Sequence, residues 1–147
     1  MAKSLSKPSS DLVRENAALM AEANSLYNQI NRIWEKAELK LREIGVLRPF
    51  KAYLHTDECG DESSFGVAKD GGKWRIYLVT SDVRDHDDEH TKWTLITECP
   101  VETRVNFVEH LPKLFEKLVE SNREAVVNLR TAALKSAEVF KQLDLEI

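Results

Sequence analysis

The fold is decided by residues 10–44, which read SDLVRENAALMAEANSLYNQINRIWEKAELKLREI. Apolar side chains recur in this stretch at steps of three, four and seven residues, at Leu12, Leu19, Ala23, Leu26, Ile30, Ile33, Ala37, Leu41 and Ile44. That spacing is the period of an α-helix with one apolar face, so a single long helix is predicted from residue 10 to about residue 45. Gly45 follows the last apolar residue, in the position where a left-handed residue commonly ends a helix.

A second apolar line, Met20, Tyr27 and Trp34, runs beside the first at seven-residue spacing. The combined face is wider than the two-position seam of a simple coiled coil, so it needs two neighbours. Monomeric proteins rarely leave a face of this size uncovered. We therefore predict that Met20, Tyr27 and Trp34 contact a protein partner, and we expect a homodimer or a hetero-complex formed through the helices.

Residues 102–143 repeat the helical pattern, with an interruption at Pro112. Proline has no backbone N–H to donate, so we predict a short helix over 102–110, a kink, and then a second long helix. Short connections favour adjacent packing of successive elements. The two long helices are therefore predicted to pair antiparallel as a coiled-coil-like stalk, with residues near Leu26 against residues near Leu129.

The stretch from residue 47 to residue 100 is rich in aromatic and β-branched residues, and is predicted to form a four-stranded antiparallel meander. The strands are expected at 50–55, 65–69, 73–80 and 92–99. Asp70, Gly71 and Gly72 lie between the second and third strands, and supply the positive φ angles that a tight hairpin turn requires. The chain is therefore predicted to be one α+β domain, residues 10–147, after a flexible tail of residues 1–9.

Composition narrows the class of protein. The chain has 147 residues, a net charge of −4 and 42% hydrophobic residues, values typical of a globular protein that stays in water. No apolar run is long enough to cross a membrane, and the basic N-terminal residues lack the apolar core of a signal peptide. Cys59 and Cys99 are too few for a disulfide scaffold, so both are expected to be reduced and the cytoplasm is the expected location.

Two connections between the predicted strands are strongly acidic. The carboxylates belong to Asp57, Glu58, Asp61 and Glu62 in the first connection and to Asp85, Asp87, Asp88 and Glu89 in the third. In an up-and-down meander these connections lie at the same end of the sheet, so they are predicted to form one acidic tip. Such a tip could dock a basic protein or hold a divalent cation, although two solvated loops explain the charge more simply.

The third connection also contains a short motif, because His86, Glu89 and His90 fit the pattern H-x-x-E-H of one class of zinc peptidases. That chemistry needs both histidines on one face of a helix, whereas this stretch is predicted to connect two strands. We therefore treat His86, His90 and Glu89 as weak metal candidates, predict no catalytic residue and expect no cofactor.

One face of the predicted sheet combines aromatic and basic side chains, namely Lys51, Tyr53, His55, Arg75 and Tyr77. Such rings and cations can stack bases and neutralise phosphates, but the negative charge of the chain opposes a polyanion. We favour a macromolecular interaction or adaptor module that binds itself or a protein partner through its long helices and acidic tip. A small metal-dependent enzyme is the alternative, and a nucleic-acid-binding module is third. The sequence indicates no membrane partner and defines no small-molecule substrate.

Overall fold

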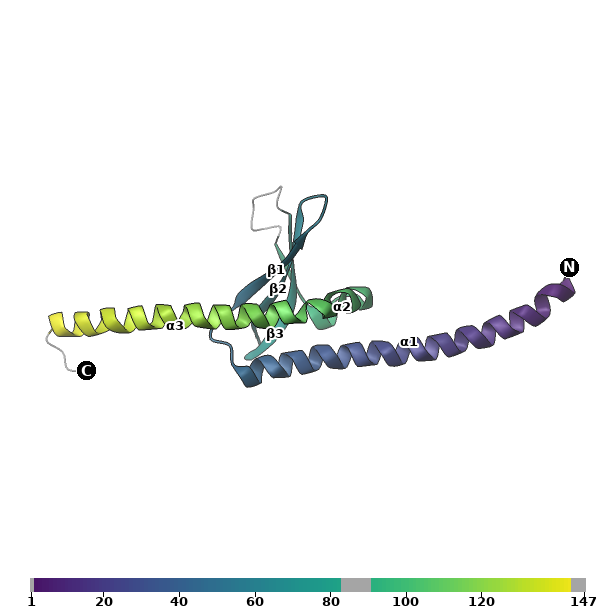
Figure 1. Cartoon of the computed structure of the whole chain (residues 1–147), viewed down its shortest axis with the longest axis horizontal. Coiled ribbons are helices and arrows are strands. Elements are labelled where there is room, and N and C mark those ends of the chain that lie inside the picture. The colour runs from purple at the N-terminus through teal and green to yellow at the C-terminus, as the bar shows by residue number, and fades with distance from the viewer. Residues whose placement is uncertain (1, 83–90, 144–147) are drawn as a thin grey trace.

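The computed structural model describes residues 2–82 and 91–143. Its elements follow one another as α1 (Ala2–Ile44), β1 (Phe50–Thr56), β2 (Asp61–Asp70), β3 (Lys73–Asp82), β4 (Lys92–Leu95), the 3₁₀-helix η2 (Ile96–Glu98), α2 (Val101–Phe107), the 3₁₀-helix η3 (Val108–His110) and α3 (Leu111–Gln142). The predicted α+β class, with a four-stranded antiparallel sheet and a long C-terminal helix, is confirmed. Figure 1 shows the sheet at the centre, with a long helix leaving it on either side.

The strands form a meander in the order β1-β2-β3-β4, and every neighbouring pair is antiparallel. The hairpin between β2 and β3 turns at Gly71 and Gly72, whose φ angles of 59° and 82° are the positive values that a two-residue turn requires. The residues on either side of these glycines pair across the turn, as predicted. β4 is shorter than the predicted 92–99, because the chain turns into η2 at Ile96, whose side chain is fully buried.

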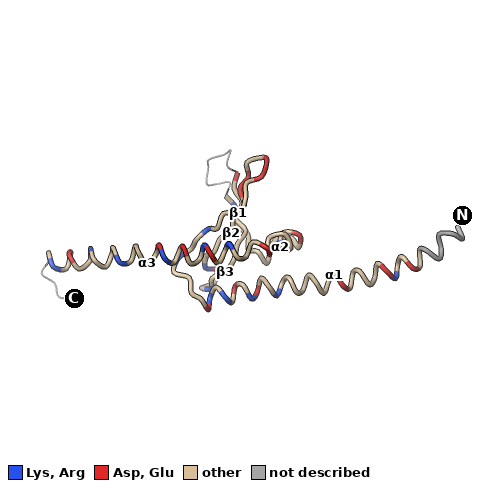
Figure 2. The backbone as a smooth tube through the Cα atoms, viewed as in Figure 1, with Lys and Arg blue, Asp and Glu red and all other residues tan. Residues whose placement is uncertain are grey.

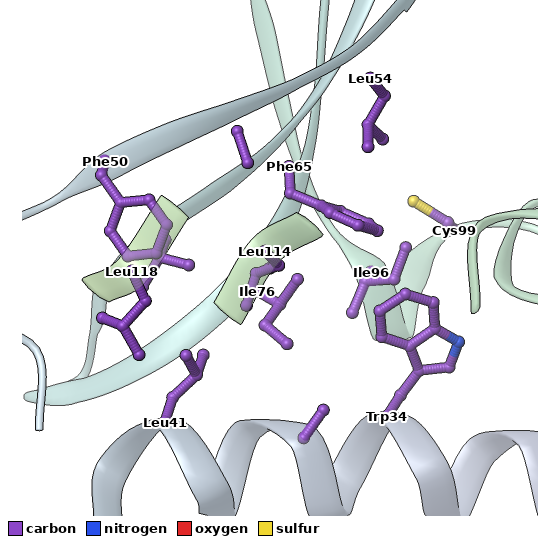
Figure 3. Packing of buried hydrophobic residues seen from close by; sticks show 13 residues of the cluster. Trp34, Leu41, Phe50, Leu54, Phe65, Ile76, Ile96, Cys99, Leu114 and Leu118 are labelled. Carbon is purple, nitrogen blue, oxygen red and sulfur yellow. The ribbon is translucent and has the colours of Figure 1, made fainter. Parts of the chain in front are cut away.

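One face of the sheet holds the hydrophobic core (Figure 3). Trp34 and Leu41 from α1 and Leu114 and Leu118 from α3 have no exposed surface. They pack with sheet side chains that share one face, namely Phe50, Ala52, Phe65, Val67 and Ile76. Both long helices therefore lie on the same face of the sheet. We call the sheet, together with the helical segments packed on it, the head.

α1 also closes the part of β3 that β4 leaves unpaired. β4 pairs only with residues 77–80 of β3, so the backbone of Ile76 meets α1 instead. The buried carboxylate of Glu38 accepts hydrogen bonds from Ile76 N (2.9 Å) and from Arg75 Nε (2.7 Å). Because the edge of a sheet presents unpaired backbone groups, these contacts satisfy the edge and fix α1 to the head.

The two long helices run in the same direction and overlap only where both cross the sheet (Figure 1). Trp34 Nε1 donates to the carbonyl of Arg104 (3.0 Å), shortly before α3 begins. Further along, Asn122 Nδ2 donates to the carbonyl of Gly45 (3.0 Å), where α1 ends. Residue numbers therefore increase together along the two helices, and the predicted antiparallel arrangement is wrong.

The predicted contact between Leu26 and Leu129 fails for the same reason. These residues lie on parts of the helices that leave the sheet on opposite sides, and they are 48% and 61% exposed. The cause is the segment made of η2 and α2, which carries the chain from β4 back along α1 to the level of Trp34 before α3 starts. The prediction had relied on short connections at one end of the sheet, which would have placed the start of the long C-terminal helix beside the end of α1.

The helix ends agree with the sequence prediction except at the start of α1. α1 begins at Ala2, so residues 2–9, predicted as a flexible tail, extend the helix; lengthening an existing helix costs far less than nucleating one. α1 ends as predicted at Gly45, which has a φ of 99° and donates its N–H to the carbonyl of Leu41 (2.9 Å). The predicted short helix and break are present, because η3 separates α2 from α3 and Pro112 lies in the first turn of α3.

Candidate interaction surfaces

The two long helices extend beyond the head as arms. We call residues 9–29 of α1 the α1 arm and residues 126–142 of α3 the α3 arm. Every residue of the α3 arm is exposed, and so is every residue of the α1 arm except the half-buried Ala23. The arms leave the head on opposite sides (Figure 1), so neither arm covers the other.

The α1 arm carries an apolar face that the described parts of the chain leave uncovered. This face, the α1 stripe, consists of Leu12, Leu19, Met20, Leu26 and Tyr27, whose exposed fractions lie between 42% and 61%. Met20 and Tyr27 lie fourteen and seven residues before Trp34, and therefore on the side of the helix that packs on the sheet further along. The α1 stripe is thus a continuation of the core face beyond the edge of the sheet.

Charge is sparse along this arm. Glu22 is the only charged residue between Glu15 and Arg32, and Figure 2 shows few red or blue segments in this part of α1. A helix that faces water on all sides is usually stabilised by many charged pairs. The α1 arm therefore has few charged pairs that could stabilise it as a helix exposed to water.

The α3 arm has a weaker apolar face. Leu129 and Phe140 lie on the same side of the helix as the buried Leu118, and they are 61% and 38% exposed. Between them on that side, Ala132 and Ser136 are small. The α3 arm therefore offers less apolar surface than the α1 stripe, which is the stronger candidate site.

Of the three residues predicted to meet a partner, Met20 and Tyr27 are exposed on the α1 stripe. Trp34 is a core residue instead: it is fully buried, and its ring meets Phe65 edge-on with centroids 5.8 Å apart. The sheet covers α1 at this position and not at the other two. Leu26 and its neighbours were not identified from the sequence as exposed candidates for an interface. The row of apolar residues that contains Leu26 had been predicted to pack against the second long helix.

The described part of the acidic tip lies at one end of the sheet. Asp61 and Glu62 begin β2 and pair with the last residues of β3, and the red loop in Figure 2 marks this end. Asp57 Oδ1 accepts hydrogen bonds from the backbone N–H groups of Cys59 and Asp61, both at 2.9 Å. This carboxylate therefore holds the turn between β1 and β2, while Glu58 is exposed at its tip.

The acidic tip does not assemble a metal site from its described residues. A shallow depression of about 390 Å³ is lined by Asp57, Asp61, Glu62, Ser63, Thr80, Ser81 and Asp82. Within residues 2–82 and 91–143, however, no three His, Cys, Asp or Glu side chains come together as metal ligands would. The remaining predicted tip residues, Asp85, His86, Asp87, Asp88, Glu89 and His90, lie outside the described residues. Metal binding by His86, Glu89 and His90 of the H-x-x-E-H motif therefore stays a prediction.

The face of the sheet opposite the core is aromatic. Trp93 is 37% exposed on this face and meets the ring of Tyr77 edge-on, with ring centroids 5.5 Å apart. Lys51 Nζ lies 5.5 Å from the centroid of the same indole, a cation–π contact. A side chain at Gly66 would overlap the indole and Val79, so glycine is what allows Trp93 to approach the sheet closely. Burial raises the pKa of the Tyr77 hydroxyl.

Two of the residues predicted to give this face a basic character are engaged elsewhere. The strand register shifts between Tyr53 and His55, and the ring of His55 stacks on Phe107 of α2, with centroids 6.3 Å apart. Arg75 is held by the buried Glu38. The outer face keeps its aromatic rings and loses much of its available positive charge, which weakens the case for nucleic-acid binding.

The two cysteines are free, as predicted. Cys59 is exposed, whereas Cys99 is buried in the core, and this burial raises the pKa of its thiol against a smaller opposing effect of Arg104. In the part of the chain that the structure describes, no helix has the length and apolar character to span a membrane.

No protein-family model, curated protein or solved structure matches this chain. Its class is therefore defined by its own fold and surfaces. It is an α+β protein whose sheet carries helices on one face and whose two long helices continue outward as exposed arms.

Proposed function

We propose that this protein is a binding module, which associates with a protein partner or with a second copy of itself through the apolar faces of its helix arms. The α1 stripe carries this proposal. Complete burial of a large apolar side chain contributes about 1.5–3 kcal/mol. The five residues of the stripe are each about half exposed, so covering them would contribute about 1 kcal/mol per side chain.

The head supports an adaptor role, because it holds the arms in a defined relation. Glu38 fixes α1 to the edge of β3. At the other end of the overlap, the Asn122 side chain accepts a hydrogen bond from Leu47 N (3.1 Å) and donates one to the carbonyl of Gly45. An adaptor needs two surfaces that are kept apart, and the two arms provide them on opposite sides of one rigid unit.

The proposal is tested by making the α1 stripe polar and leaving the core unchanged. We would replace Leu19 and Leu26 with glutamine and measure the mass of the purified protein by sedimentation velocity over a range of concentrations. Affinity capture from cells with the same variant measures association with other proteins. The parent is expected to form a complex by one of these measurements, and the variant is expected to lose it.

The matched control replaces Val127 and Leu134 with glutamine. These residues are 52% and 71% exposed, but they lie on the side of α3 away from its core face. The control variant should keep the complex of the parent. A parent that stays monomeric and captures nothing, or a complex that survives in the stripe variant, would contradict the proposed function.

A further inference from the structure

The α1 stripe has a pattern that fits a second copy of itself. We infer that two copies of this chain pair through their α1 arms, antiparallel, with the two-fold axis beside Met20. This inference rests on the proposed function and adds to it the identity of the partner and the register of the contact.

The register follows from where the large and small residues of the arm fall. With the arms antiparallel, Leu19 of one copy faces Ala23 of the other, and Leu12 faces Ile30. Leu26 faces Asn16, which leaves no leucine opposed by a second leucine. In a two-fold pair each contact occurs twice, so one register covers the α1 arm from Leu12 onward and extends to Ile30 at the edge of the head.

The flanking residues decide the direction of pairing. Val13, Met20 and Tyr27 form an apolar row on one flank of the seam, and Glu15 and Glu22 lie on the other flank. In an antiparallel pair each flank meets the same flank of the other copy, so the apolar row is buried against itself. In a parallel pair this row would lie against the glutamates and remain wet.

The position of the head also favours antiparallel pairing of the arms. From Trp34 to Leu41 the core side of α1 is covered by the sheet of its own chain. A parallel pair in register would bring two heads to the same end of the helices and set each against the other. An antiparallel pair places the heads at opposite ends, and the apolar contact stops at Ile30, which is half-buried because it already packs partly against the core of its own chain.

Cysteine cross-linking tests the register with the full chain. In a Cys59→Ser background, the Met20→Cys variant should form a disulfide-linked dimer under mild oxidation, because the two residues meet at the axis. Ala21→Cys is the control, since residue 21 points away from the seam. Held together in a dimer, the thiols have an effective concentration in the millimolar range, so cross-linking should exceed that of the control on the order of a hundredfold at micromolar protein.

Leu19→Cys separates the two directions. In the antiparallel pair residue 19 faces residue 23, whereas in a parallel pair it would face itself. Faster cross-linking of Leu19→Cys than of Met20→Cys would overturn the inference. Circular dichroism of each variant shows whether the fold is kept. If a cysteine variant loses helix, it is left out of the comparison and the register is decided by the Glu22→Gln measurement described next.

A second measurement needs no cysteine. The antiparallel register brings Glu22 of one copy next to Glu22 of the other, so Glu22→Gln should tighten the dimer on the order of twofold by removing repulsion between like charges. Weaker association of this variant would count against the register. If Leu19→Gln with Leu26→Gln abolishes a complex while Met20→Cys never cross-links, the proposed function stands and the second copy is excluded as the partner.

Discussion

Replacing Glu38 with alanine is expected to destabilise the head by about 3 kcal/mol. Glu38 is 4% exposed, and its Oε2 is the acceptor for both Ile76 N and Arg75 Nε. Loss of a buried partner for the Ile76 amide costs about 1–3 kcal/mol, and loss of a hydrogen bond between charged groups costs a similar amount. Arg75 keeps its bond to Thr97 (3.1 Å), so the sum stays near the lower end of the range for broken buried ion pairs, about 3–5 kcal/mol.

Glu38→Gln separates the two contributions. The glutamine keeps a neutral acceptor for the Ile76 amide and loses the charge that faces Arg75, so about half of the destabilisation should remain. Glu43→Ala is the matched control, because this glutamate of the same helix is 71% exposed in its side chain and forms an exposed ion pair with Lys40. Its free energy of unfolding should stay within about 0.5 kcal/mol of the parent.

Urea unfolding followed by far-ultraviolet circular dichroism gives the four free energies of unfolding, of the parent and the three variants, on one scale. The expected order of stability is parent, Glu43→Ala, Glu38→Gln and Glu38→Ala. If Glu38→Ala were as stable as Glu43→Ala, the contact between α1 and the free edge of β3 would not hold the helix, and the rigid relation between the arms would lose its basis.

Four further outcomes are expected from the contacts of the head. Gly66→Ala should destabilise the protein by about 1–3 kcal/mol and shift Trp93 fluorescence, because the added methyl group displaces the indole; an unchanged spectrum would contradict that packing. Asn122→Ala should cost about 1–2 kcal/mol in urea unfolding, since its side chain both accepts and donates across to the end of α1. Cys59 should react at once with a thiol reagent and Cys99 only after unfolding. Because the folded state favours the neutral Cys99 thiol, stability should fall as pH rises above the unfolded thiol pKa of about 8.5, and Cys99→Ala should remove that fall.

The parts of the fold that depend on neighbouring residues could be predicted from the sequence. The helical period of residues 10–44, the turn at Gly71 and Gly72, and the break before Pro112 are all local signals, and the structure contains each of them. The relative direction of the two long helices depends instead on the point at which η2 and α2 bring the chain to the start of α3. No periodicity within either helix encodes that position.

The sequence predicted which apolar residues form the face of α1, but it did not predict which of them are exposed. Met20, Tyr27 and Trp34 share one helical line in the sequence, yet only Trp34 lies under the sheet. The extent of α1 that the sheet covers is set by tertiary packing and not by the local sequence of the helix. Likewise, Glu38 resembles any charged residue of a solvated helix, and it is buried because β4 is too short to pair with the whole of β3.

α1 is one continuous helix, whose last turns belong to the head and whose first turns form the arm. Nucleation is the expensive step of helix formation, and the folded head provides a formed helical end from which the α1 arm can propagate. The arm thus reaches a partner with its backbone already ordered, and less conformational entropy is lost on association than when a disordered peptide folds on binding. By the same linkage, any partner that binds only the helical arm raises the apparent stability of the head, even though it never touches the sheet.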